Sequence, residues 1–129
     1  MTPADTVRAY YEALRTGDPL GPFFAESPDA VKFGIGERLV GYAAIADGLQ
    51  EQTARTRDWT VESRDLRVVD RETHAVFSDD VRMSWYDTAT YADHDYETRW
   101  SGTLTHAPDA NRKWKFLGMH VSVTGPTAD

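Results

Sequence analysis

Residues Glu97–Thr124 read ETRWSGTLTHAPDANRKWKFLGMHVSVT. Two runs rich in aromatic and β-branched residues flank the turn PDANR, and this pattern predicts a β-hairpin. Each run carries one residue that suits a pocket better than a core, Arg99 on the first and His120 on the second. We therefore expect this hairpin to contribute to a ligand site.

The register of this hairpin decides which side chains share a face. If the turn is centred between residues 109 and 110, Arg99 lies opposite His120, with Ser101, Thr103, Trp114 and Ser122 on the same side. A slip by one residue would instead place Trp100 and Leu104 beside His120. An arginine and a histidine among aromatic residues are typical of a small-ligand pocket. The alternatives are a structural histidine at His120 and an ion pair of Arg99 with Glu97 or Asp95.

Strand alternation sorts the run 74–86 into two faces. The predicted core face holds Ala75, Phe77, Asp79, Val81, Met83 and Trp85. A carboxylate among apolar side chains needs a partner or has its pKa raised. We expect one of these for Asp79, unless a bulge at Asp79 and Asp80 turns it outward.

On the last strand, the same alternation places Trp114, Phe116, Gly118, His120 and Ser122 on one face. The other face holds Lys115, Leu117, Met119, Val121 and Val123. Both faces are largely apolar, so we expect helices to cover one and a second subunit to cover the other. The sequence thus predicts a homodimer formed through the sheet.

Helices precede the long strands along the chain. Thr2 and Pro3 suit a helix start and Gly17 its end, a shorter helix can begin at Asp18, and a third follows Gly41. Short strands are expected at 30–35 and 37–40, long strands at 59–70 and 74–86, and an irregular stretch at 87–96. Grouped helices followed by consecutive strands indicate one α+β domain over residues 1–129 with an antiparallel sheet.

Composition narrows the function classes. Fourteen basic against 21 acidic residues give a net charge of −7, which disfavours nucleic acid and anionic membranes as partners. The absence of cysteine excludes disulfides and Cys-ligated zinc. The cluster 93–97 (Asp, His, Asp, Glu) has no second ligand group at metal spacing, so we expect neither a metal nor a cofactor. Without an apolar run of roughly 18 residues or an export signal, we expect a cytoplasmic protein.

The chain resembles a SnoaL-like domain of the nuclear transport factor 2-like superfamily over nearly its whole length. The segment VKFGIGERLVGYAAI (residues 31–45) and the hairpin carry this resemblance. The hairpin is also similar to the association domain of calcium/calmodulin-dependent protein kinase II, through Glu97-Thr98-Arg99, Trp114 and His120-Val121-Ser122. The resemblance implies a cone-shaped, strongly curved mixed or antiparallel sheet around about three N-terminal helices, a cystatin-like roll. Its pocket would open at the wide end and include Arg99 and His120.

The leading functional hypothesis is a pocket for a polar or carboxylate-bearing organic ligand. Arg99 would pair with the anion, His120 would form a hydrogen bond to it and Ser122 would lie in the same site. The walls would come from Trp59, Phe77, Met83, Trp85 and Phe116. The resemblance also implies an alternative, an enzyme of the ketosteroid isomerase, polyketide cyclase or dehydratase type with Asp79 or His120 as general base. The last strand departs from the cyclase pattern because it contains no Asp or Glu. A non-catalytic assembly module is the third hypothesis.

Overall fold

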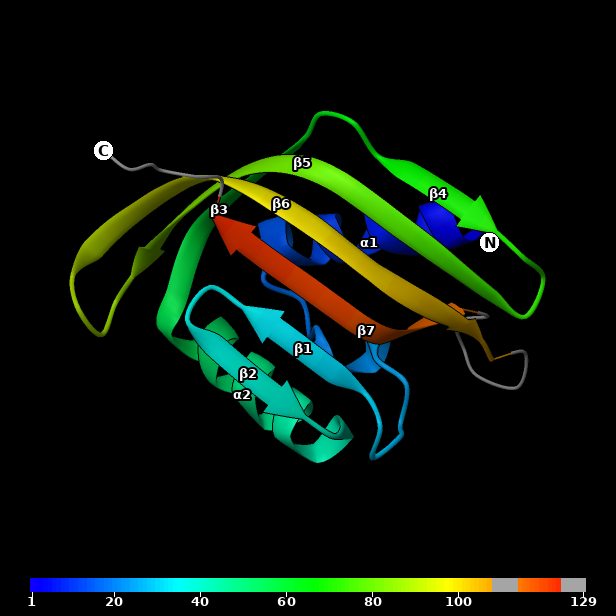
Figure 1. Cartoon of the computed structure of the whole chain (residues 1–129). Coiled ribbons are helices and arrows are strands. Elements are labelled where there is room, and N and C mark those ends of the chain that lie inside the picture. The colour runs from blue at the N-terminus through cyan, green and yellow to red at the C-terminus, as the bar shows by residue number, and fades with distance from the viewer. Residues whose placement is uncertain (108–113, 124–129) are drawn as a thin grey trace.

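The computed structural model describes residues 1–107 and 114–123. One curved mixed sheet dominates it, with the strand order β2-β1-β7-β6-β5-β3 and with β4 paired to β5. Figure 1 shows the sheet bending over α1, while α2 lies beneath β1 and β2. The elements are α1 (Pro3–Thr16), the 3₁₀ turn η1 (Gly21–Phe23), β1 (Val31–Gly34), β2 (Glu37–Val40), α2 (Tyr42–Arg55), β3 (Thr56–Ser63), β4 (Arg67–Asp70), β5 (His74–Asp87), β6 (Ala92–His106) and β7 (Trp114–Val123).

The expected fold class is confirmed. The sheet is mixed because β1 runs parallel to β7, whereas β7, β6, β5 and β3 form an antiparallel meander. Helix α1 begins with the predicted cap, in which the Asp5 backbone N–H donates to Thr2 Oγ1 at 3.1 Å. It ends at Gly17, whose φ of 77° is the left-handed conformation that glycine adopts without strain.

The helix expected from Asp18 is wrong. Residues Gly21–Phe23 form only a single 3₁₀ turn, so the described part of the chain has two α-helices rather than three. A segment this short cannot offset the cost of helix nucleation. The turn nevertheless buries Phe23 and Phe24. Neither α-helix in the described ranges is long and apolar enough to cross a membrane.

Two strand boundaries also differ from the expectation. The strand predicted over 59–70 is two strands, β3 and β4, and β3 begins directly after α2 at Thr56. The irregular stretch expected at 87–96 is mostly strand, because β5 and β6 pair down to Asp87 opposite Ala92. The Asp87 carboxylate accepts hydrogen bonds from the backbone N–H groups of Ala89 and Thr90, and this local bonding closes the turn.

A β-bulge in β7 changes the predicted faces of the hairpin formed by β6 and β7. Thr103 pairs with Gly118 but Leu104 pairs with Phe116, so Leu117 is one extra residue. Trp114 and Phe116 before the bulge are buried, and so are Met119 and Val121 after it. His120 and Ser122 therefore lie on the outer face, and the prediction that they share a face with Trp114 and Phe116 is wrong.

The predicted cross-strand partner of Arg99 is also corrected. Arg99 pairs with Ser122, and His120 pairs with Ser101. Because these positions are two residues apart along each strand, Arg99 and His120 still share the outer face. The inner face of β6 instead carries the buried residues Thr98 and Trp100.

Candidate functional site

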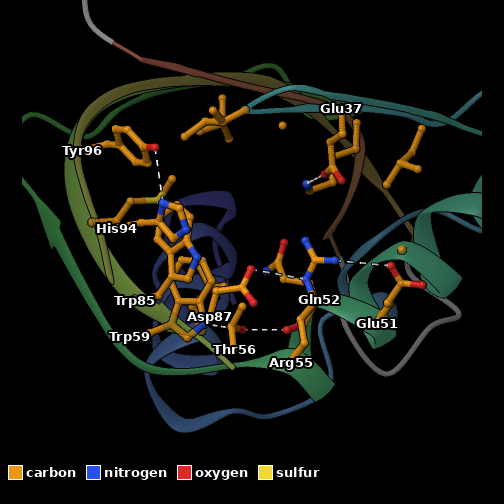
Figure 2. Close-up of a pocket in the computed structure, with 18 of the residues that line it drawn as sticks. Glu37, Glu51, Gln52, Arg55, Thr56, Trp59, Trp85, Asp87, His94 and Tyr96 are labelled. Atoms are coloured by element: carbon orange, nitrogen blue, oxygen red, sulfur yellow. Dashed lines mark hydrogen bonds and ion pairs between the residues drawn. The ribbon is translucent and has the colours of Figure 1, made fainter. Parts of the chain in front are cut away.

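A cavity of about 490 Å³ lies between α2, the β1–β2 hairpin and the far ends of β3, β5 and β6. Figure 2 shows side chains from these elements converging on it. Its apolar lining comes from the inner face of the sheet and from α1: Tyr10, Leu14, Leu39, Trp59, Met83, Trp85, Tyr96, Trp100 and Val121. Between the sheet and α2 there is thus a hollow of the size that small organic ligands occupy.

A column of stacked rings forms one wall of the cavity. Trp59 and Trp85 stack with ring centroids 4.6 Å apart, Trp85 and His94 at 5.0 Å, and His94 and Tyr96 at 6.0 Å. The register of β5 and β6 creates this column because it places Trp85 opposite His94. Trp59 is held from the other side, where its Nε1–H donates to Thr56 Oγ1 at 2.9 Å. This wall is rigid and amphipathic.

Charged side chains line the opposite part of the cavity. Lys32, only 5% exposed, donates from Nζ to Glu37 Oε1 at 2.5 Å. Arg55 Nε on α2 lies 3.7 Å from Asp87 Oδ2. Burial acts to raise the pKa of Asp87, but two backbone N–H donors and the nearby charge of Arg55 outweigh it and lower the pKa. Asp87 is therefore an anion at neutral pH.

Asp79 faces inward but does not line this cavity. It pairs regularly with Trp100, so the alternative of a bulge that turns it outward is wrong. Its carboxylate accepts hydrogen bonds from Tyr11 Oη at 2.8 Å, Ser63 Oγ at 2.6 Å and the Asp65 backbone N–H at 2.9 Å. Burial raises the pKa of Tyr11, and its hydrogen bond to Asp79 raises it further. The partner expected for the carboxylate is thus a set of three donors.

Arg99, His120 and Ser122 surround a separate, shallow hollow of about 420 Å³ on the outer face of the sheet. Its lining also includes Arg67 and Asp80. The ion pairs suggested for Arg99 do not form, because Glu97 pairs with Arg64 and Asp95 pairs with Arg82. The His120 ring instead packs against Phe33 at 5.5 Å.

The structure therefore divides the predicted ligand-binding residues. Trp59, Met83 and Trp85 line the large cavity. Phe77 and Phe116 are packed against each other in the core, with ring centroids 5.6 Å apart. Arg99, His120 and Ser122 lie on the outer face. Asp79 is buried on the inner face and His120 is exposed on the outer face, although both are among the residues that line the outer hollow. Their catalytic roles stay predictions.

Sequence reasoning missed the polar half of the cavity. Along residues 93–97, His94 and Tyr96 point inward and the three acidic residues are exposed. The polarity of this stretch predicted a loop, although it has the strict alternation of a strand. Lys32 gave no such signal because apolar residues flank it on both sides. Among the residues that the structure describes, no three His, Asp or Glu side chains converge on a point where a metal could bind.

Comparisons with solved structures extend over nearly the whole chain. A nuclear transport factor 2-like superfamily protein from Salmonella enterica serovar Typhimurium is 18% identical, with a TM-score of 0.80, over 96% of this chain and 89% of that one. A candidate dehydratase of the same family from Streptomyces avermitilis is 16% identical, with a TM-score of 0.81, over 95% and 94%. A candidate calcium/calmodulin-dependent protein kinase II association domain from Xanthomonas campestris is 17% identical, with a TM-score of 0.75, over 96% and 86%.

At these identities the solved structures show a shared fold and nothing further. No curated protein matches the sequence. A family model, that of the SnoaL-like domain, matches residues 4–126. Because this match spans most of the chain, the chain belongs to the SnoaL-like domain family.

Proposed function

We propose that this chain binds a small, polar organic molecule in the large cavity. The observation that carries the proposal is a hollow of about 490 Å³ with stacked aromatic rings on one side and, on the other, the buried Lys32 paired with the more exposed Glu37. Apolar walls supply most of the binding free energy of such a site, and a few placed polar groups orient the ligand. The outer hollow is open and polar, so we assign the ligand to the inner cavity.

Trp85 is the residue to change first, because its ring is the middle of the aromatic wall. Wild-type protein is screened by thermal shift against aromatic compounds and organic acids, since a ligand that binds only the folded state raises Tm. We expect Trp85→Ala to lose the shift given by any hit. The matched control is Tyr86→Ala, because Tyr86 is the next residue along β5 and does not line the cavity.

The same screen discriminates between the two hollows. Arg99→Ala removes one of the two arginines that line the outer hollow and leaves the inner cavity intact. If Arg99→Ala loses the ligand shift while Trp85→Ala keeps it, the ligand binds on the outer face and the proposal is wrong. Absence of a hit across the panel would also count against it.

Acid–base catalysis is the second candidate function. The cavity contains His94, whose Nδ1 lies 3.4 Å from Tyr96 Oη, and a base with an oriented partner is the arrangement that proton abstraction requires. The candidate dehydratase from Streptomyces avermitilis has the same fold. If the chain is such an enzyme, a bound carbonyl compound with α-hydrogens should exchange them for deuterium in D₂O faster than in buffer, as followed by NMR. Exchange at the same rate with His94→Gln would remove His94 as the base.

A further inference from the structure

A second, smaller hollow of about 150 Å³ adjoins the large cavity, between the C-terminal ends of α1 and α2. Its floor is apolar, because Ala13, Leu14 and Leu20 line it and each is at most 5% exposed. The exposed side chains of Arg57 and Asp58 lie at its rim. A hollow with an apolar floor and a polar rim suits a small aliphatic group.

Trp59 is the largest of the side chains that separate the two hollows. Leu14, Gln52, Thr56 and Trp59 line both of them. The indole Nε1–H of Trp59 donates to Thr56 Oγ1 at 2.9 Å, and the Thr56 hydroxyl donates in turn to the Gln52 carbonyl oxygen at 2.6 Å. The face of the same indole stacks on Trp85 (Figure 2). This hydrogen bond and this stack hold the indole at the boundary between the hollows.

The backbone that carries Trp59 departs from the regular ladder of the sheet. The pairing of β3 with β5 shifts register between Arg57 and Thr60, so Asp58 and Trp59 together lie opposite Trp85. Asp58 has a φ of 58°, in the left-handed region that aspartate tolerates better than most residues. A β-bulge changes the direction in which its side chains point. The bulge therefore accounts for the position of the Trp59 indole.

We propose that Trp59 is a specificity-determining residue that limits the length of the ligand. This inference rests on the proposed function and narrows its ligand class to ring compounds with short substituents. A straight aliphatic chain that points toward the ends of α1 and α2 stops at the Trp59 indole. Without the indole, the same chain continues into the second hollow.

The 4-alkylphenols from methyl to pentyl test this limit, because each member adds one methylene to the same ring. Dissociation constants are measured by calorimetry. Each buried methylene tightens binding about fourfold, so affinity for wild-type protein should rise along the series until the chain reaches Trp59 and then level off or fall. In Trp59→Ala the rise should continue to longer chains. A mere loss of stability would weaken all members alike.

Removal of the indole also enlarges the large cavity, so a second substitution must show where the longer chain lies. Thr53 lines the second hollow and not the large cavity. Thr53→Phe should fill the second hollow. The double variant with Trp59→Ala and Thr53→Phe should therefore lose the additional affinity for the longer phenols that Trp59→Ala alone gains.

Thr56 and Thr53 supply a matched pair of substitutions that leave the indole intact. Thr56→Val keeps the shape of the side chain but removes the oxygen that accepts the Trp59 hydrogen bond. The indole should then give way more easily, so the affinity for pentylphenol relative to methylphenol should rise severalfold. Thr53→Val removes a hydroxyl from the same helix, and this ratio should stay at its wild-type value.

The outcomes separate this inference from the one on which it rests. If affinity depends on chain length in the same way in wild-type protein and Trp59→Ala, the length limit is wrong while the cavity remains a binding site. A gain that survives Thr53→Phe would also reject the second hollow as the place of the chain. Should Trp59→Ala not fold, an unchanged ratio in Thr56→Val rejects the limit instead. If methylphenol and ethylphenol do not bind wild-type protein at millimolar concentration, both proposals are overturned.

Discussion

Asp79 illustrates how the same residue type can serve stability rather than chemistry. A carboxylate with 4% exposure in a sheet core invites a catalytic interpretation. Its contacts favour another one, because three donors, from α1, β3 and the segment after β3, all converge on it. The carboxylate thereby ties the first helix to the sheet. Most lone pairs of the Asp79 carboxylate already accept hydrogen bonds from these donors. The side chains of His94 and Glu37, in contrast, line the large cavity.

Asp79→Ala should lower the free energy of unfolding by about 3 kcal/mol, because it leaves a buried hydroxyl and a backbone N–H without acceptors. Urea denaturation measures the change. The control is Asp80→Ala, since Asp80 is the next residue and lies exposed on the outer face; its effect should be within about 0.5 kcal/mol. A fully stable Asp79→Ala protein that has lost ligand binding would restore the functional interpretation of Asp79.

At the scale of elements, local sequence patterns predicted the inner face of β5 and the two ends of α1. Alternation along β5 placed Phe77, Asp79, Val81 and Met83 on the inner face, as observed. Helix α1 was predictable because Thr2, Pro3 and Gly17 each have a local backbone role. These signals are carried by residues close to one another in sequence, so no knowledge of distant contacts was needed.

The bulge at Leu117 could not be predicted from such local patterns. Both faces of β7 are largely apolar, so a bulge that exchanges the two faces cannot be recognised in the pattern of apolar residues. The site was affected more than the fold, because the shift moves His120 and Ser122 from the predicted pocket to the outer face. The cavity also depends on Lys32, Glu37 and Arg55, which come from three elements that meet only through tertiary packing.

For the whole molecule, the uncovered outer face is the feature that bears on assembly. Val69 and Val76 pair across β4 and β5 and remain 43% exposed, and Phe33 beside His120 is 38% exposed. Exposed apolar side chains on a sheet face mark it as a candidate surface for another protein to cover. A second copy of this chain is the predicted partner.

Light scattering should give roughly twice the monomer mass at micromolar concentration, because a self-complementary patch closes as a dimer. Val76→Glu should shift the protein to monomer, since a charge on this face would be buried without a partner. Val40→Glu is the control, because Val40 is similarly exposed but lies on the edge strand β2. A monomeric wild-type protein would contradict both the dimer and the role of this face.

The stacked pair of Trp59 and Trp85 has one more consequence. Two indoles with centroids 4.6 Å apart and planes within 15° are close enough for their electronic transitions to couple. Such coupling depends steeply on distance and orientation, and the pair borders the cavity directly, as Figure 2 shows. The protein therefore carries a built-in optical reporter, whose circular dichroism signature would change whenever a bound molecule shifts one ring against the other.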